Sequence, residues 1–190
     1  MHSKTFQVRI ILFVFLLAGL LAFIDIPASQ ADIRLVTGTV TKISDGDTFQ
    51  LTTPEQTILK IRLYGIDAPE TDKINHQTGK VNISGQPYGK ESCDALKNKI
   101  MGKKVKVDIL DTDKYRRMVG MIHMNDRNIN LEMVTEGHAE AFMEYLKEPY
   151  RSQFLEVEQK AKSAKKGIWS LPNYERPRNF RKRLKVSGGE

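Results

Sequence analysis

Carboxylate and guanidinium side chains gather in a few short segments of this sequence. They occupy Asp45–Thr48, Arg62, Asp67–Thr71 and Asp113–Arg117. Carboxylate oxygens are the ligands that Ca²⁺ prefers, and a guanidinium binds phosphate through a planar fork of N–H donors. Acids and arginines in this combination are typical of phosphodiester chemistry, and they favour a protein that cuts nucleic acid.

Each segment has a simpler explanation when it is taken alone. Asp45–Asp47 has the composition of a hairpin turn, and Asp67–Thr71 that of a turn or a helix start. Arg62, Arg116 and Arg117 would be ordinary exposed charges on strands. The combination of all the segments, rather than any one of them, favours a functional site.

The elements that must position these side chains are mostly strands. Alternating apolar and polar residues rich in Val, Ile and Thr predict them, and Asp45–Gly46 is a strong hairpin signal between the first two. In the third strand, alternation places Arg62 on the face opposite Leu59, Ile61 and Leu63. The predicted strands cover residues 36–43, 48–53, 57–64, 104–110 and 118–124.

Helical spacing predicts helices over residues 89–101, 129–136 and 151–166, the last two ended by Gly137 and Gly167. Five antiparallel strands with a helix between the third and fourth are the layout of an OB-fold barrel. We therefore expect a mainly β chain with some α (α+β), built as a five-stranded OB-fold barrel with about three helices. Residues 72–87, rich in Asn, Gly and Pro, are expected to form a mobile loop beside the acidic segment.

Residues 1–31 have the pattern of a signal peptide. A basic start precedes an uncharged apolar stretch, Ile10–Ile24, which is shorter than the roughly 20 residues of a membrane-spanning helix. Small residues at Ser29 and Ala31 favour cleavage after Ala31. An uncleaved membrane anchor formed by residues 10–24 is the alternative. The domain would then cover 32–170, and 171–190 would be a basic, weakly ordered tail.

The composition agrees with a polyanionic partner but does not identify one. Lys and Arg number 30 against 23 Asp and Glu, which gives a formal charge of +7. The single cysteine, Cys93, excludes an intramolecular disulfide and is expected to be a small helix residue rather than a nucleophile. His76, His123 and His138 lack the spacing of a metal site and are expected to be surface or packing residues.

Four motifs, in the same order along the chain, resemble those of the staphylococcal nuclease (thermonuclease) family. They are Ile43–Thr48, Arg62–Thr71, Asp113–Arg117 and Gly167–Trp169, and the resemblance runs from about Val36 to about Ser170. It implies an OB-fold hydrolase of the micrococcal nuclease type. Such an enzyme is a Ca²⁺-dependent, sugar-nonspecific endonuclease that hydrolyses DNA and RNA to 3′-phosphorylated products.

The resemblance also assigns the residues of a metal site with one Ca²⁺ per active site. Asp47 and Asp67 match its carboxylate ligands, and the backbone carbonyl of Ala68 would add a third oxygen. Glu70 matches the glutamate that engages the attacking water, either as a general base or chiefly by orienting it.

The phosphate and the nucleotide are assigned to a second set of residues. Arg62 and Arg117 match the two arginines that stabilise charge building on the phosphorus. Lys114, Tyr115 and Tyr145 match substrate contacts of the same family.

The sequence departs from the family pattern at three places. Ala68 replaces a hydroxyl residue of the founding enzyme, although the expected ligand there is the backbone carbonyl. Arg116 replaces a more usual Gly, so it would be strained if that position requires a positive φ. The 72–87 segment is longer than its counterpart, which would alter substrate access or preference.

DNA and RNA are therefore the expected substrates, with single strands preferred. We expect a monomer that is secreted or periplasmic after transient membrane contact through the signal segment. Two alternatives are a catalytically weak or inactive OB-fold module that binds nucleic acid, and a basic adhesin that coats polyanions without metal dependence.

Overall fold

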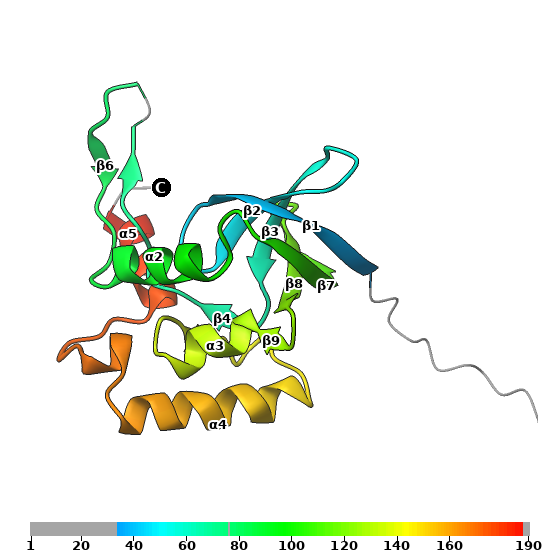
Figure 1. Cartoon of the computed structure of the whole chain (residues 1–190). Helices are drawn as coiled ribbons and strands as arrows, with labels where there is room; N and C mark the ends of the chain where they lie inside the picture. Colours follow the sequence, from blue (N-terminus) through cyan, green and yellow to red (C-terminus); the bar gives the residue numbers. More distant parts are fainter. Residues whose placement is uncertain (1–33, 76, 188–190) are drawn as a thin grey trace, which may run out of the picture. The chain divides into compact units, whose positions relative to one another are not determined.

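Five strands close into a barrel. The computed structural model describes residues 34–75 and 77–187. The barrel strands are β1 (Arg34–Ile43), β2 (Thr48–Thr52), β3 (Ile58–Leu63), β7 (Lys104–Thr112) and β8 (Met118–Met124). Antiparallel pairs give the order β3-β2-β1-β7-β8, and a parallel pairing of β3 with β8 closes the ring (Figure 1). The predicted α+β chain with a five-stranded OB-fold barrel is confirmed.

The three predicted helices lie where the sequence places them, and two further helices were not predicted. The predicted ones are α2 (Gly89–Ile100), α3 (Ile129–Thr135) and α4 (Tyr150–Ser163), and the further ones are the 3₁₀ helix η1 (Gly167–Ser170) and α5 (Pro177–Ser187). The side chain of Asn128 caps α3 by accepting a hydrogen bond from the Leu131 N–H at 3.0 Å. Gly137 follows α3 with a φ of 75°, a conformation that glycine adopts without strain.

The α5 helix corrects the expectation of a weakly ordered tail over residues 171–190. Its Pro177 and Phe180 are buried, and Trp169 packs edge-on against Tyr174 in the connecting segment, with ring centroids 5.1 Å apart. Arginines of this region pair with acids of the domain, as Arg176 does with Glu140 at 2.9 Å. The predicted tail is basic, as its sequence shows, but these contacts hold part of it against the domain as a helix.

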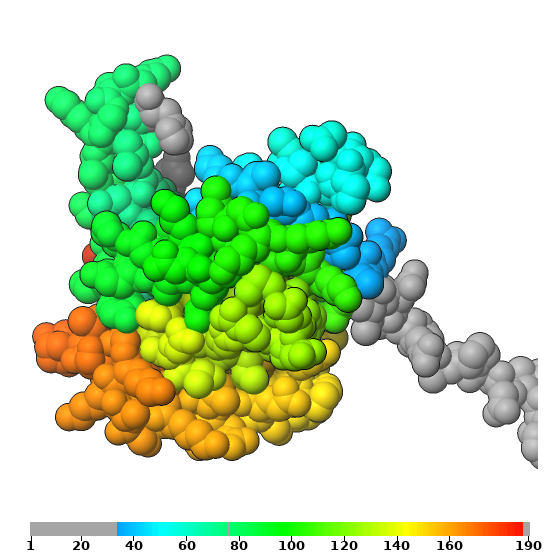
Figure 2. Space-filling model, in the orientation of Figure 1, coloured from blue at the N-terminus to red at the C-terminus, as the bar shows by residue number. Residues whose placement is uncertain are grey.

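The segment 72–87 also contains regular structure that the sequence did not predict. Two short strands, β5 (Lys73–Ile74) and β6 (Val81–Ile83), pair as an antiparallel hairpin within the expected loop. Figure 2 shows this hairpin standing out from the surface above α2. Three further short strands are β4 (Ile66–Asp67), which pairs with β10 (Glu140–Ala141), and β9 (Arg127–Asn128), which extends β8.

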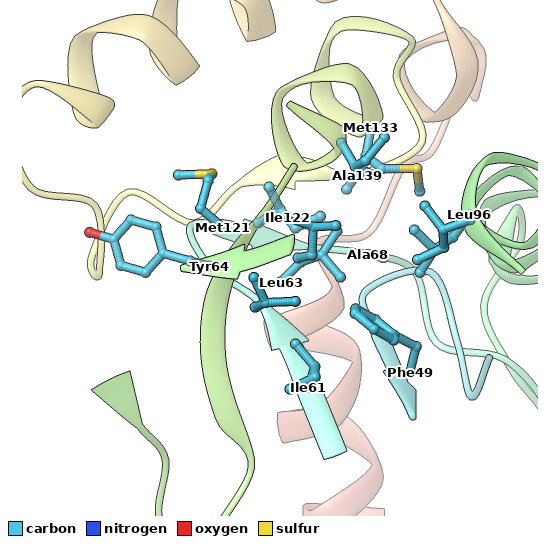
Figure 3. Packing of buried hydrophobic residues seen from close by; sticks show 14 of the residues in the cluster. Phe49, Ile61, Leu63, Tyr64, Ala68, Leu96, Met121, Ile122, Met133 and Ala139 are labelled. Carbon is cyan, nitrogen blue, oxygen red and sulfur yellow. The ribbon is translucent and has the colours of Figure 1, made fainter. Parts of the chain in front are cut away.

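The core lies inside the barrel and between the barrel and the helices. Phe49, Ile61 and Leu63 project inward from the strands and meet Leu96 of α2 and Met133 of α3 (Figure 3). Burial of each such side chain contributes roughly 1.5–3 kcal/mol. The same alternation that buries Ile61 and Leu63 turns Arg62 to the other face, as predicted, and thereby delivers it to the acidic segments.

The predicted signal peptide or membrane anchor lies outside the described residues. Within residues 34–75 and 77–187, no helix is both long enough and apolar enough to cross a membrane.

Candidate active site

Arg62 joins the two predicted metal ligands, Asp47 and Asp67. Its Nη1 donates to Asp47 Oδ1 at 2.7 Å, and its Nη2 donates to Asp67 Oδ1 at 2.9 Å. Asp47 precedes β2 and Asp67 ends β4, and both are buried, at 3% and 0% exposure. Residues that are separate in sequence therefore form one charged cluster at the ends of three short elements.

The β1–β2 turn fixes the position of Asp47. The Asp45 side chain accepts a hydrogen bond from the Asp47 N–H at 3.0 Å, which is the local contact typical of turn-forming aspartates. Gly46 is required by close packing, because a Cβ there would lie 1.9 Å from Ser92 Oγ and 2.8 Å from Ala68 Cβ. Asp45–Asp47 is thus both the predicted hairpin turn and part of the site.

The acids of the cluster differ in their protonation chemistry. Burial favours the neutral form of Asp47, but Arg62 and the hydrogen bonds from Ala68 N–H and Thr48 outweigh it, and its pKa lies below the ordinary value. Burial and the neighbouring Asp47 raise the pKa of Asp45 to about 8. The cluster therefore holds more carboxyl groups than Arg62 alone can neutralise.

The backbone of Glu70 is clamped at the base of the β5–β6 hairpin. Gln86 accepts from the Glu70 N–H through Oε1 at 3.1 Å, and its own N–H donates to the Glu70 carbonyl at 2.8 Å. Gly89 lies so close that a Cβ there would be 2.2 Å from the same carbonyl oxygen. These contacts fix the backbone position of Glu70 and so limit the positions open to its carboxylate. Gln86 lies in none of the sequence motifs, so its role was not predicted.

Arg117 is held beside the acids by the turn that precedes β8. Its Nε donates to Asp113 Oδ2 at 2.7 Å, and its Nη1 donates to Thr48 Oγ1 at 3.3 Å. Thr48 in turn donates to Asp47 Oδ1 at 2.9 Å. Burial disfavours the charge of Asp113, but the hydrogen bonds and charge of Arg117 keep its pKa below the ordinary value. The structure thus brings Arg117 together with Asp47, Arg62 and their neighbours.

Two of the three predicted substrate contacts lie next to Arg117. Tyr115 is 65% exposed, and the Lys114 Nζ lies 5.1 Å from its ring centroid and the Arg117 Cζ 5.6 Å from it. Tyr145 is also exposed, but its ring packs on Phe142 at 4.7 Å. That contact does not reach the acids, so the role of Tyr145 stays a prediction.

An arginine outside the sequence motifs completes the cluster. Arg181 of α5 donates from Nη1 and Nη2 to the two carboxylate oxygens of Asp67, at 3.0 and 2.8 Å, and from Nη1 to Glu70 Oε1 at 2.8 Å. Pro177, placed where a helix begins, and the apolar Phe180 were the available signals for α5.

The donor set fits a hard cation only in part. Among the side chains of residues 34–75 and 77–187, no three from His, Cys, Asp and Glu are arranged as a metal site. Asp47 and Asp67 offer buried carboxylate oxygens, and Ala68, which follows Asp67 in the chain, donates its N–H to Asp47 Oδ2 at 3.1 Å. Such a set suits Ca²⁺ when backbone and water oxygens add to it. Ca²⁺ therefore fits these residues, with the two carboxylates providing part of its coordination shell and backbone and water oxygens providing the rest.

The histidines and the cysteine have other surroundings. His123 lies 3.3 Å from Asp108, and His138 lies 3.3 Å from Glu136 and 3.4 Å from the Tyr88 hydroxyl. Burial raises the pKa of the Cys93 thiol, which disfavours the thiolate that a nucleophile needs. His76 lies outside the described residues.

Arg116 adopts a φ of 61°, the left-handed conformation suspected from its sequence position. Because a side chain is strained there and glycine is not, we expect Arg116→Gly to raise the free energy of unfolding by about 1 kcal/mol. Urea denaturation of the two proteins measures this difference. Lys114→Gly is the control, because Lys114 lies in the same turn without a positive φ and its replacement should not stabilise. Equal effects of the two substitutions would show that the conformation of Arg116 is not strained.

The barrel and the cluster define an OB-fold protein whose site combines buried acids with phosphate-binding arginines. The family model described as "Staphylococcal nuclease homologue" matches residues 60–171, which is more than half of the chain. The chain belongs to this family. The matched residues include Arg62, Asp67, Glu70 and Arg117, whereas Arg181 lies beyond them.

Similar proteins come from bacteria and plants. A protein of Shigella flexneri named "Micrococcal nuclease" is 33% identical over 88% of this chain and 91% of its own length. An "Uncharacterized endonuclease" of Haemophilus influenzae is 31% identical over 78% of this chain and 74% of its own length. A rice protein (Oryza sativa subsp. japonica), "Probable staphylococcal-like nuclease CAN3", is 38% identical over 65% of this chain. The chain spans only 28% of the length of that rice relative.

Proposed function

We propose that this protein is a Ca²⁺-dependent, sugar-nonspecific endonuclease that hydrolyses DNA and RNA to 3′-phosphorylated products. One observation carries the proposal: the acids Asp47, Asp67 and Glu70 and the arginines Arg62 and Arg117 converge in one hydrogen-bonded site. Membership of the staphylococcal nuclease family supports the same reaction class.

Asp47, Asp67 and the Ala68 carbonyl would hold the cation. When bound, Ca²⁺ supplies positive charge and coordination positions for a phosphate oxygen and for water. The burial of Asp47 and Asp67 keeps their oxygens fixed, because Arg62 and the backbone N–H of Ala68 already determine the orientation of the carboxylates.

Glu70 would accept a proton from the attacking water, or orient that water. Attack on phosphorus forms the new P–O bond while the bond to the 5′ oxygen breaks. The leaving 5′ oxygen takes a proton from solvent water, which leaves a 3′-phosphate and a 5′-hydroxyl. The clamp from Gln86 holds the Glu70 backbone while its side chain remains 21% exposed, so solvent water can reach the carboxylate.

Arg62 and Arg117 would stabilise the charge that builds on the phosphate oxygens. Asp113 and Thr48 orient the Arg117 guanidinium, and the acids orient Arg62, so neither group has to be ordered during the reaction. Contacts directed to phosphate carry little base or sugar information, which supports action on both DNA and RNA. Exposed Tyr115 and Lys114 beside Arg117 suit a nucleotide of a single strand.

Export through residues 1–31 and a monomeric state belong to the proposal on sequence grounds. The apolar stretch at 10–24 motivates export to a secreted or periplasmic location, with a membrane anchor as the alternative. A noncatalytic nucleic-acid-binding module is the second candidate function, because Arg116 next to Arg117 adopts the left-handed conformation, which is strained for a residue other than glycine.

Metal removal tests the proposal. We expect the purified protein to cleave single-stranded DNA and RNA with Ca²⁺ and to stop on addition of EGTA. The fragments should resist 3′ extension by a polymerase until a phosphatase removes the 3′-phosphate. Binding without cleavage would instead establish the noncatalytic module, and binding insensitive to metal with a steep salt dependence would indicate the adhesin.

A further inference from the structure

Arg181 occupies the oxygen atoms that a catalytic cation needs. Asp67 is fully buried, and both of its carboxylate oxygens accept hydrogen bonds from Arg181, while Oδ1 also accepts from Arg62. The same guanidinium reaches Glu70 Oε1 at 2.8 Å. A single arginine therefore hydrogen-bonds both to Asp67, the predicted metal ligand, and to Glu70, the predicted base.

The charge of Arg181 matches this position. Burial disfavours a charged guanidinium, but the hydrogen bonds to Asp67 and the charges of Asp67 and Glu70 overcome it and raise the pKa of Arg181. Buried carboxylates need a cationic or hydrogen-bonding partner, and Arg181 provides one for Asp67 where Ca²⁺ would otherwise do so.

The α5 helix is attached by few buried groups. Pro177 and Phe180 are its buried residues among the described part of the chain. Arg181 adds its bonds to Asp67 and Glu70. Arg178 pairs with Glu144, and Arg183 pairs with Glu175 of the segment just before the helix; these two arginines are 57% and 58% exposed. Exposed ion pairs contribute little stability, so the Arg181 contacts and the burial of Pro177 and Phe180 are what hold α5 at the site.

We propose that Arg181 competes with the catalytic cation for Asp67 and Glu70, and that α5 blocks the site until the cation displaces it. The inference rests on the proposed function, because it takes Ca²⁺ as the cation. Competition for shared ligands is reciprocal: Arg181 weakens cation binding, and the cation weakens docking of α5. The α5 helix lies beyond residues 60–171, so the proposed block on cation binding comes from a segment outside the part of the chain that the family model matches.

A third phosphate-binding arginine would be a different role for Arg181. That role requires the guanidinium to face a substrate phosphate, whereas its fork is directed at Asp67 and Glu70. The two roles predict different results, because loss of a phosphate contact would weaken substrate binding and leave the affinity for the free cation unchanged.

Calorimetric titration of the nucleic-acid-free protein with Ca²⁺ tests the competition. We expect Arg181→Gln to bind Ca²⁺ about tenfold more tightly than the unmodified protein, since the cation no longer has to displace the guanidinium. Lys185→Gln is the matched control: it removes one positive charge from an exposed position of the same helix and should leave the affinity unchanged.

Hydrogen–deuterium exchange of α5 gives a second readout. Ca²⁺ should accelerate exchange over residues 177–187 in the unmodified protein, and Arg181→Gln should exchange rapidly without Ca²⁺. Equal or weaker Ca²⁺ affinity in Arg181→Gln, or exchange in α5 that Ca²⁺ does not change, would overturn the inference and leave the calcium-dependent nuclease standing. Failure of both proteins to bind Ca²⁺ would overturn both proposals.

Discussion

Glu70→Gln is expected to lower kcat for single-stranded DNA about 1,000-fold, within the range that general-base catalysis contributes. The amide keeps the size of the side chain and can still contact Arg181, but it cannot take a proton from the attacking water. The backbone clamp from Gln86 does not depend on the side chain, so the fold around residue 70 should persist. Single-turnover cleavage with saturating Ca²⁺ measures the chemical step directly.

The control for Glu70→Gln is Glu55→Gln, which removes an exposed carboxylate from the turn between β2 and β3. It should leave kcat unchanged. A Glu70→Gln enzyme that retained most of its rate at every pH would exclude Glu70 as the base and would limit it to orienting water. A loss accompanied by an equal loss of Ca²⁺ binding would make Glu70 a metal ligand instead.

Arg62→Ala is expected to lower the free energy of unfolding by about 3 kcal/mol, because it leaves Asp47 and Asp67 buried without their shared partner. Removal of one partner from a buried ion pair costs roughly 3–5 kcal/mol. Asp67 keeps its bonds from Arg181, and Asp47 keeps its bonds from Thr48 and Ala68, so we expect the loss to lie at the lower end of this range. Urea denaturation in EGTA measures the loss. Ca²⁺ at about 100 times its dissociation constant should restore about 2.7 kcal/mol if the cation binds the same acids.

Arg127→Ala is the matched control for Arg62→Ala. Arg127 pairs with Glu132 at a solvent-exposed position, and the loss of such a pair should lower stability by at most about 1 kcal/mol, with no rescue by Ca²⁺. A small effect of Arg62→Ala, equal to that of Arg127→Ala, would mean that the acids of the cluster do not depend on Arg62 for stability.

The barrel could be predicted because its signals are local. Alternation in β3 fixes which face buries Ile61 and Leu63, and Asp45–Gly46 marks the turn that joins β1 and β2. Boundaries of the barrel strands agree with the predictions to within two residues. The β5–β6 hairpin was missed because its strands are two and three residues long and exposed, so no buried face gives them a pattern.

The proximity of the motif residues could be predicted from the sequence, whereas the contact that a distant segment makes with them could not. Asp47, Arg62, Asp67, Glu70 and Arg117 lie together, as the resemblance implied. Arg181 could not be found in this way, because 114 residues separate it from Asp67 and its neighbours in sequence are also basic. An arginine that binds acids and one that faces solvent have the same sequence pattern. The burial of Phe180 against the domain, which the structure shows, distinguishes Arg181 from its exposed neighbours.

The most direct test of the proposed active site is a crystal structure of the protein with Ca²⁺ and a dinucleotide carrying a nonhydrolysable phosphate linkage. We expect Ca²⁺ bound to Asp47, Asp67 and the Ala68 carbonyl, with the phosphate between Arg62 and Arg117 and Glu70 facing it. Ca²⁺ bound elsewhere, or a phosphate that contacts neither arginine, would contradict the assignment of this cluster as a nuclease active site.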